Sequence, residues 1–249
     1  MNSETFGGYM KREDVRDWTF ELYNRVMPGM PDAYALFRER LTADCPSSGG
    51  RLVDLGCGTA DFLASLMDWA EEIIGVDTLP VTGRYHRYLE ADLNQEIPLE
   101  DNSVDVVTSR YALEHLAFPN NLFKEIHRIL RPGGATLLLT PNVFYYPYAI
   151  NHLLSGVLNQ KTRMKLVEKV SGRESDDIFP VLYGCNTPGR FKEELRGAGF
   201  KITLLTTCCD CLVSAYNRPL GLAAIGYERL VTALHINGAK GLIVAEGKK

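Results

Sequence analysis

The sequence lacks several features that mark membrane, secreted and nucleic-acid-binding proteins. No apolar run approaches the ~18 residues that a membrane-spanning helix requires. Residues 1–10 lack the basic start and the apolar run of a signal peptide, so we expect a cytoplasmic protein without a membrane partner. The formal net charge of −4 argues against a protein that binds by neutralising many phosphates. We therefore expect no nucleic acid among its partners, and a small or uncharged substrate.

Metal-ligating patterns are also scarce. The chain has six cysteines, and only Cys208 and Cys211 have a CxxC spacing. No second pair and no histidine stands near them, whereas structural zinc sites need about four Cys or His ligands. We expect no metal site and interpret this segment as a half-buried strand end, with a metal or redox pair as the alternative. A cytoplasmic setting would keep the thiols reduced.

Composition and patterning predict one α/β domain. The chain has 249 residues, of which 45% are hydrophobic and 23% charged, values that suit a globular protein with a sizeable core. It has no internal repeat and no low-complexity tract. Strands are predicted at 51–55, 72–76, 87–90, 104–109, 134–139, 201–207 and 241–246. Helices are predicted at 13–26, 32–43, 60–69, 119–130 and 187–198, with another within 218–236. The alternation of strands and helices predicts a parallel sheet with right-handed crossovers.

A glycine turn follows the first of these strands. Residues 53–62 end an apolar strand, turn on Gly56 and Gly58 and open a helix, so the backbone can come close to a bound ligand. The GxGxxG turn that holds a pyrophosphate would require a third glycine where this chain has Asp61. An acid there would repel phosphate at the start of a helix. The turn therefore favours a ligand without phosphate, and a cationic ligand suits the surrounding acids.

Acids stand at the ends of three successive strands. Asp54 lies in the first strand, Asp77 ends the second, and Asp92 follows the third. A carboxylate in the position of Asp77 can accept hydrogen bonds from both hydroxyls of a ribose, as in Rossmann folds, with a helix or turn cap as the alternative. Asp92 precedes a turn, so an Asx-turn is its alternative. With the glycine turn, these acids predict a nucleotide-type pocket at the carboxyl edge of the sheet.

These residues, in this order, resemble the class I S-adenosylmethionine-dependent methyltransferases. Val53 to Gly58 reads much like the first motif of that family, and the stretches Leu113 to Leu116 and Arg131 to Gly134 look like later motifs. The resemblance is strong over residues 50–142 and loose elsewhere. It implies an α/β fold in three layers, with a Rossmann-like methyltransferase sheet of seven strands. The sheet would be mostly parallel with the last strand antiparallel, accompanied by N-terminal helices and a helical insertion after strand five.

The resemblance also implies a cofactor and the residues that hold it. The cofactor would be S-adenosyl-L-methionine, and the product S-adenosyl-L-homocysteine. The implied cofactor-binding residues are Asp54, Gly56, Gly58, Asp77, Asp92, Leu93 and Arg110. The first of the three acids would serve the methionine end, the second the ribose and the third, with the backbone of the following residue, the adenine. Arg110 ends the fourth strand, where family members place backbone carbonyls near the methionine amine.

We predict that residues 1–249 form a single methyltransferase domain in four parts. These parts are an N-terminal helical lid (1–50), a cofactor-binding core (51–142), a substrate-cap insertion (143–186) and the C-terminal part of the sheet (187–249). Only Thr78 to His86 separates the second strand from the third, which is too short for a full crossover helix, so the family pattern is truncated there. Substrate selection is expected in the insertion, because loops at strand ends carry function on a rigid scaffold.

The expected reaction needs little besides alignment and one proton acceptor. Methyl transfer from a sulfonium requires that donor and acceptor are held in line and that water is excluded. A hydroxyl or ammonium acceptor must also lose a proton, a task that suits histidine. We expect His115, on a short helix after the fourth strand, to be the catalytic base, with packing or capping of its turn as the alternative. His152 is a second candidate base, for which a surface position is the alternative.

The expected acceptor is a small molecule. DNA amino-methyltransferases carry Asn/Asp-Pro-Pro-Tyr/Phe after the fourth strand, where this chain has Thr-Ser-Arg-Tyr at 108–111. Protein arginine methyltransferases would show two spaced glutamates where Glu114 stands alone. We therefore expect transfer to oxygen, before nitrogen, of a small metabolite. The expected acceptor contacts are Tyr111, Asn142, Tyr145 and Tyr146, with loop packing as the alternative for the tyrosines.

Some features leave alternatives open. Residues 172–180 look like bacterial methyltransferases with poorly defined acceptors, and Arg173, Asp176 and Asp177 either contact a polar acceptor or fix their own loop. One rival function is a nicotinamide oxidoreductase, which Asp61 disfavours. Another is a catalytically silent subunit that keeps the fold and activates a partner, which the short segment 78–86 leaves open. The sequence gives no indication of the oligomeric state.

Overall fold

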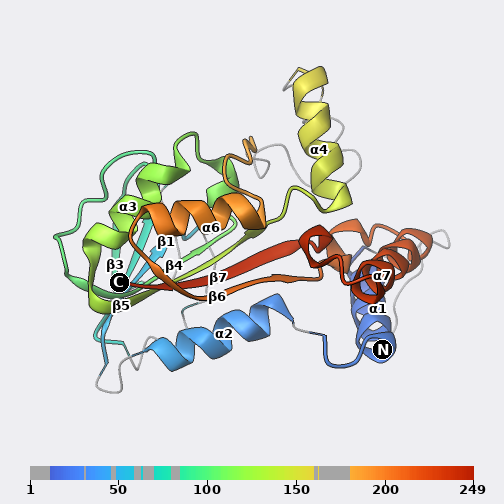
Figure 1. The fold of residues 1–249 in the computed structure, drawn as a ribbon, viewed down its shortest axis with the longest axis horizontal. Helices are drawn as coiled ribbons and strands as arrows, with labels where there is room; N and C mark the ends of the chain where they lie inside the picture. The colour runs from blue at the N-terminus through green and yellow to red at the C-terminus, as the bar shows by residue number, and fades with distance from the viewer. Residues whose placement is uncertain are drawn as a thin grey trace, which may run out of the picture. The chain divides into compact units, whose positions relative to one another are not determined.

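A computed structural model shows a seven-stranded sheet flanked by helices, together with a separate group of helices (Figure 1). The residues that it describes are 12–30, 32–45, 49–58, 63, 70–79, 85–159, 162 and 180–249. The contacts divide the chain into two compact units. We call the unit of residues 33–143, 181–207 and 242–249 the sheet unit, and the unit of residues 1–32, 144–180 and 208–241 the helical unit. The prediction of one domain in four parts stays a prediction.

The sheet has the strand order β3-β2-β1-β4-β5-β7-β6. Its strands are β1 (Arg51–Leu55), β2 (Glu72–Asp77), β3 (Arg87–Glu90), β4 (Val104–Arg110), β5 (Leu130–Pro141), β6 (Lys201–Cys208) and β7 (Leu242–Lys248). Strands β1 to β5 pair in parallel, whereas β7 pairs with β5 in the antiparallel direction. The predicted fold class is confirmed. Because β1 and β4 are neighbours although β2 and β3 lie between them in sequence, the order reverses beside β1, which is where α/β sheets bind ligands.

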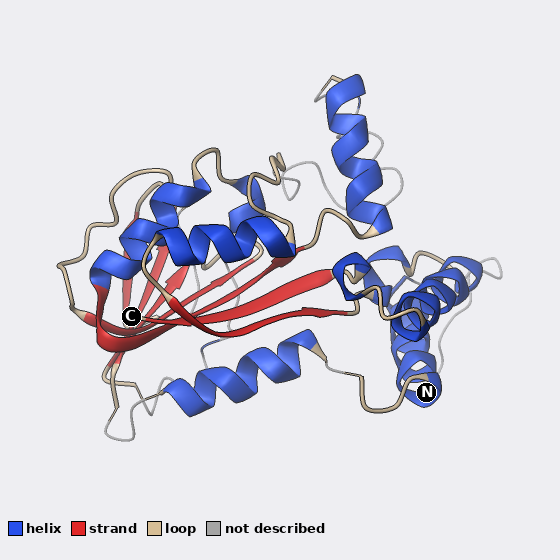
Figure 2. Ribbon diagram, viewed as in Figure 1, coloured by secondary structure: helices blue, strands red, loops and turns tan. Residues whose placement is uncertain are grey.

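Helices cover both faces of the sheet (Figure 2). On one face lie α3 (Pro119–Ile129) and α6 (Pro188–Gly197), and on the other α2 (Ala33–Asp44). Helix α3 buries Leu122, Phe123, Ile126 and Ile129, the spacing of a helix with one apolar side. The Phe123 ring meets Phe191 of α6 edge to face with centroids 5.4 Å apart. The main core therefore lies between these two helices and the strands.

The opposite helix, α2, is held by apolar and charged contacts. Phe37 and Leu41 are buried one turn apart on α2, which contacts β5 and β7. Arg40 Nε lies 2.9 Å from Glu246 Oε2 on β7, and Lys248 Nζ donates to Asp44 Oδ1. This side of the sheet unit is thus fixed by an ion-pair network as well as by burial.

Strand β5 begins earlier than the sequence predicts. The strand was expected at 134–139, but it spans Leu130–Pro141 and so includes Arg131 to Gly134, whose proline and glycines are typical of a turn. Gly133 has the positive φ of +83° expected of a tight bend, and the register with β4 shifts between Val104 and Val106. The backbone therefore makes an irregularity within the strand rather than a turn before it, because residue 130 already pairs with β4.

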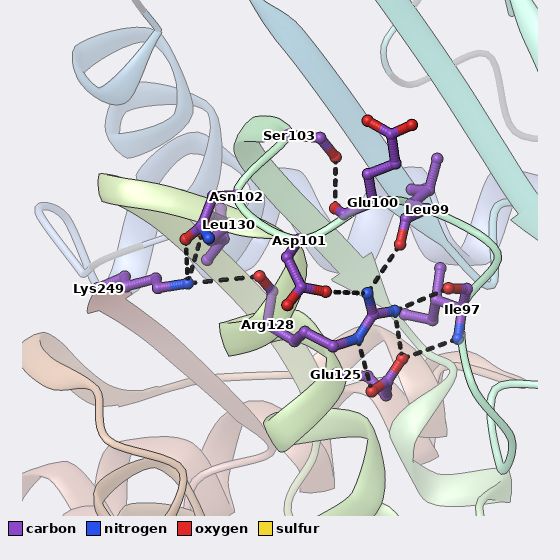
Figure 3. Close-up of polar contacts among 10 residues, drawn as sticks. All are labelled: Ile97, Leu99, Glu100, Asp101, Asn102, Ser103, Glu125, Arg128, Leu130 and Lys249. Atoms are coloured by element: carbon purple, nitrogen blue, oxygen red, sulfur yellow. Dashed lines mark hydrogen bonds and ion pairs between the residues drawn. The ribbon is translucent and has the colours of Figure 1, made fainter.

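The loop that precedes β4 is anchored to α3 by Arg128 (Figure 3). The guanidinium donates to Glu125, to the Asp101 carboxylate and to the carbonyls of Ile97 and Leu99, at distances between 2.7 and 2.9 Å. Glu125 Oε2 in turn accepts the N–H of Ile97 at 2.9 Å. Charge-assisted hydrogen bonds of this kind are short and strong, so this cluster fixes the loop that leads into the first residues of β4.

The helical unit contains α1 (Arg12–Val26), α4 (Tyr146–Val157) and α7 (Arg218–Ala233), with a short 3₁₀ helix, η4 (Cys211–Ser214). Helices α1 and α7 contact each other, and a Cβ at Gly221 would lie 2.5 Å from Thr19 Oγ1, so a glycine is needed at this crossing. The core of the unit includes Cys211, Ala224 and Ile225. Helix α4 confirms a helical insertion after β5.

The cysteines of this region are thiols in buried surroundings. Burial raises the pKa of Cys208 to about 11 and that of Cys211 to about 12. Among the described residues, no group of three or more His, Cys, Asp or Glu has the arrangement of a metal site. No helix in the described ranges is long and apolar enough to cross a membrane.

Some predictions fall on residues outside the described part of the chain. These are the helix at 60–69, of which only Leu63 is described, the third-glycine position Asp61, and Arg173, Asp176 and Asp177. Of the segment 78–86, Thr78, Leu79, Tyr85 and His86 are described.

Candidate cofactor site

The glycine turn after β1 has the backbone that its sequence predicts. Gly56 and Gly58 have φ values of +68° and +49°, in the left-handed region that favours glycine. A Cβ at Gly56 would lie 2.4 Å from Cβ of Ala112, so the turn packs directly on the loop that follows β4. A Cβ at Gly58 would meet no described atom within 4 Å. The first glycine is therefore required by packing against the loop after β4, and the second by its backbone conformation.

The amides of this turn are used within the protein. The N–H groups of Gly56 and Cys57 donate to the Val76 carbonyl at 2.8 and 3.2 Å, and Gly58 N–H donates to Asp77 Oδ2 at 2.9 Å. A pyrophosphate cradle needs such amides directed at the ligand. These three N–H groups are directed at β2 instead. The turn thus fits a ligand that is recognised by acids and by shape rather than by phosphate.

Asp54 is a buried carboxylate in β1. It is only 2% exposed, and its Oδ1 accepts a hydrogen bond from Thr108 Oγ1 at 2.8 Å. Burial raises the pKa of Asp54, while the nearby positive charge of Arg110 and the hydrogen bonds from Thr108 and Tyr85 lower it. Neighbours on β4 thus oppose the cost of burying this charge. Arg110 ends β4, as expected, and its side-chain charge acts on Asp54.

Asp77 stands at the end of β2 and organises the turn beside it. Its Oδ2 accepts from Gly58, and its Oδ1 accepts the N–H of Thr78 at 2.7 Å and that of Leu79 at 3.4 Å. The carboxylate therefore has the capping role that the sequence left open. An ionised carboxylate has about four acceptor positions, so ribose hydroxyls could share it.

Asp92 forms the Asx-turn that was its alternative. Its Oδ1 accepts both the backbone N–H and the side-chain amide of Asn94, each at 2.9 Å. Asn94 Oδ1 accepts from the amides of Ala117 and Phe118, which lead into α3. Leu93 is buried beside the glycine turn, since a Cβ at Gly56 would lie 3.8 Å from its Cδ1. This loop is thus fixed next to the turn that follows β1.

His115 lies on a short helix after β4, as predicted. The 3₁₀ helix η2 spans Leu113–His115, and the imidazole is 30% exposed. His115 Nε2 is 4.0 Å from Oε1 of Glu114, whose carboxyl is buried and accepts a hydrogen bond from Thr140 at 3.1 Å. Burial raises the pKa of Glu114 to about 7. His152 is exposed on α4, which is the surface position that was its alternative.

The expected acceptor contacts belong to different units. Tyr111 and Asn142 lie in the sheet unit, where Asn142 is fully buried and Tyr111 has an unusual φ of +53°. The Tyr111 hydroxyl accepts from Tyr34 of α2 at 2.9 Å. Non-glycine residues with positive φ are uncommon and concentrate where function constrains the backbone. The contact of Tyr34 with Tyr111 was not predicted, because Tyr34 belongs to no recognisable sequence motif.

Tyr145 and Tyr146 lie in the helical unit. Tyr145 is fully buried, and its hydroxyl donates to the Asp210 carbonyl at 2.9 Å. The centroid of its ring lies 5.0 Å from that of Tyr146 and 5.5 Å from that of Tyr227. Tyr146 also packs on Tyr227, with centroids 4.9 Å apart. These contacts correspond to the packing alternative for the tyrosines.

Comparisons with known proteins agree with this arrangement. The family described as "Methyltransferase domain" matches residues 53–138. A protein of Mycolicibacterium smegmatis described as "Probable S-adenosylmethionine-dependent methyltransferase" is 31% identical over 177 residues, covering 65% of this chain and 68% of that protein. The demethylmenaquinone methyltransferase of Geobacillus kaustophilus is 30% identical over 207 residues, covering 73% and 80%. In fold, the chain resembles an S-adenosylmethionine-dependent methyltransferase from Archaeoglobus fulgidus, with a TM-score of 0.55 at 18% identity over 92% of this chain and 99% of that one.

The sheet is Rossmann-like and has acids at its carboxyl edge. The described amides of its glycine turn donate to Val76 and Asp77, so they are not available to bind a phosphate. Together these features define the class of protein. The chain belongs to the S-adenosylmethionine-dependent methyltransferases. It is accordingly an enzyme that uses S-adenosyl-L-methionine, releases S-adenosyl-L-homocysteine and methylates an acceptor.

Proposed function

We propose that this protein transfers the methyl group to oxygen, in preference to nitrogen, of a small metabolite in the cytoplasm. The observation that supports cofactor binding at this edge is the position of two acids beside the glycine turn, Asp54 in β1 before it and Asp77 at the end of β2, where it accepts from Gly58. Their carboxylates carry charge of the sign that suits a cationic donor, while the amides of the turn donate to Val76 and Asp77.

Different residues of the sheet unit would bind different parts of the cofactor. Asp54 would hold the methionine ammonium, Asp77 the ribose hydroxyls, and Asp92 with the backbone of Leu93 the adenine. Bound S-adenosyl-L-methionine supplies a methyl group on a sulfonium, whose sulfur departs as a neutral thioether that needs no proton. The chain must therefore hold donor and acceptor in line and take up at most one proton.

His115 is the proposed acceptor of that proton. It is the partly exposed imidazole just past the end of β4, and Tyr111, four residues earlier, is the proposed acceptor contact on the same loop. A neutral imidazole can remove a hydroxyl proton near neutral pH. The proposed transfer to a hydroxyl oxygen uses this group as its base, and an ammonium acceptor would lose its proton to the same group.

The activity is tested by incubating the protein with S-adenosyl-L-methionine and a panel of small acceptors, and by measuring S-adenosyl-L-homocysteine. The panel includes hydroxyl-bearing and amine-bearing metabolites, and demethylmenaquinone, the compound in the name of the Geobacillus kaustophilus relative. Product with hydroxyl acceptors is expected. Cofactor binding without product from any acceptor would favour the silent-subunit alternative.

Replacement of Asp77 tests the cofactor site. Asp77→Ala removes the proposed ribose contact and the acceptor for Gly58 N–H, so we expect the affinity for S-adenosyl-L-homocysteine to fall about tenfold or more in calorimetry. Glu193→Ala, which removes an exposed acid on α6, is the matched control and should bind like the wild type. Equal affinity of Asp77→Ala and wild type would remove this residue from cofactor recognition.

Replacement of His115 tests the base. Single-turnover rates of His115→Ala with the identified acceptor should fall about 10²- to 10⁴-fold, with cofactor affinity unchanged. A rate equal to that of the wild type across pH would exclude His115 as the base.

A further inference from the structure

Tyr85 reaches the buried carboxylate of Asp54 from the segment that joins β2 to β3. Gly75 on β2 is the register partner of Asp54 on β1, so both residues face the same side of the sheet. A Cβ at Gly75 would lie 2.9 Å from two ring atoms of Tyr85 and 3.0 Å from Cys57 Sγ. The ring of Tyr85 therefore lies directly over Gly75, where a larger residue would displace it. This position brings the phenol alongside Asp54.

The phenol oxygen lies between two groups of the proposed methionine site. It is 3.5 Å from Asp54 Oδ2 and 3.3 Å from the carbonyl of Cys57, which lies between the two glycines of the turn. Thr108 donates to the other oxygen of Asp54. The single proton of the phenol is shared between these two acceptors, so each oxygen of the carboxylate has a hydroxyl within reach, one from β4 and one from the β2–β3 segment.

We propose that Tyr85 is a positioning residue for recognition of the amino-acid end of the cofactor. Its hydroxyl lies against the Asp54 carboxylate and the Cys57 carbonyl and holds both in place, so that both can accept hydrogen bonds from the methionine ammonium. This inference rests on the proposed binding of that ammonium by Asp54.

The electrostatic surroundings of Asp54 support this role. Arg110 on β4 favours the charged form, Asp77 on β2 opposes it, and the thiol of Cys57 lies nearby. Burial raises the pKa of Asp54, and the Tyr85 hydrogen bond is among the contacts that lower it. A carboxylate that loses one of its donors binds a proton at a higher pH.

The test measures how the affinity for S-adenosyl-L-homocysteine depends on pH, by calorimetry, in the wild type and in Tyr85→Phe. Because Asp54 must be ionised to bind the ammonium, affinity falls as the pH falls through the pKa of Asp54. In Tyr85→Phe this fall should move towards higher pH, because the carboxylate has lost a hydrogen-bond donor. Binding of 5′-methylthioadenosine, which has the adenosine but no amino-acid end, should stay within about twofold of the wild type.

Controls separate this role from a general effect on folding. Tyr227→Phe removes a phenol that donates to the Ala239 carbonyl in the helical unit, and should leave the pH profile unchanged. Gly75→Ala moves the ring instead of removing the hydroxyl, and should cause the same selective loss for S-adenosyl-L-homocysteine. Thermal unfolding shows whether each variant is folded.

Several outcomes would overturn the inference. Superimposable pH profiles of Tyr85→Phe and wild type would do so, as would equal losses for S-adenosyl-L-homocysteine and 5′-methylthioadenosine. If the wild type itself does not bind S-adenosyl-L-homocysteine, the proposed cofactor site fails, and the role of Tyr85 fails with it.

Discussion

Glu114 is a carboxyl group in an environment that favours its neutral form. It is 4% exposed, its Oε2 accepts from Thr140, and Thr140 in turn accepts from the side-chain amide of Asn186 at 2.6 Å. Burial raises its pKa from 4.5 to about 7. Between these two values the folded state binds more protons than the unfolded state. The contribution of Glu114 to stability is therefore largest below pH 4.5 and is lost as the pH rises towards 7.

This linkage predicts a pH-dependent difference between the wild type and Glu114→Gln. The free energy of unfolding of the wild type should fall by about 1–3 kcal/mol relative to the variant between pH 5 and pH 8, because glutamine has no proton to lose. Chemical denaturation at a series of pH values measures the difference. Glu193→Gln on the exposed side of α6 should follow the wild-type curve. A constant offset between wild type and Glu114→Gln would contradict the assignment.

The two glycines of the turn should respond differently to alanine. Gly56→Ala introduces a Cβ 2.4 Å from Cβ of Ala112 at positive φ, whereas the Cβ of Gly58→Ala meets no described atom within 4 Å and has the cost of its positive φ. We expect Gly58→Ala to lose about 1 kcal/mol of stability and Gly56→Ala to lose more, about 3 kcal/mol. Denaturant titration of both variants measures this order. Equal losses would show that packing against the loop after β4 does not restrict Gly56.

At the scale of helices and strands, the order of elements could be predicted from the sequence, because buried strands and one-sided helices have different apolar periods. β1 and α3 were predicted to within one residue. The start of β5 was not, since Arg131 to Gly134 has the composition of a turn and only pairing with β4 makes it part of a strand. This pairing joins residues that are distant in sequence, so it cannot be predicted from the local composition.

The residues of the site could be predicted where the residue type itself indicates the local geometry. The glycines of the turn and the acids at strand ends are of this kind. Tyr85, Thr108 and Tyr34 were not predicted, because their importance depends on which side chains face each other across strands and helices. The register that places Asp54 opposite Gly75, and so allows Tyr85 to reach Asp54, is known only from the folded structure.

The attachment of α3 to the loop before β4 predicts a large effect of a single arginine. Arg128→Ala leaves Glu125 and the carbonyls of Ile97 and Leu99 without these donors (Figure 3), so we expect a loss of about 2–3 kcal/mol in unfolding free energy. Arg190→Ala is the matched control, because its pair with Glu194 is 3.6 Å long and 62% of its side chain is exposed. Its cost should stay below about 0.5 kcal/mol. Similar losses in the two variants would contradict this account.

For the whole molecule, the proposed cofactor contacts all lie in the sheet unit. Saturating S-adenosyl-L-homocysteine should therefore slow amide hydrogen exchange at residues 54–58, 77–79 and 92–94, and leave α1 and α7 at their original rates. Exchange measured by mass spectrometry with and without the ligand tests this. Protection confined to the helical unit would move the cofactor site out of the sheet unit.

The inward-directed amides of the glycine turn also limit how this scaffold could be re-engineered. A designer who wished to make it accept a nicotinamide dinucleotide would gain little from restoring the missing third glycine. Val76 and Asp77 would still occupy the donors of Gly56, Cys57 and Gly58, so the end of β2 would have to be rebuilt at the same time. Conversion between the two cofactor types would thus require coordinated changes on two strands.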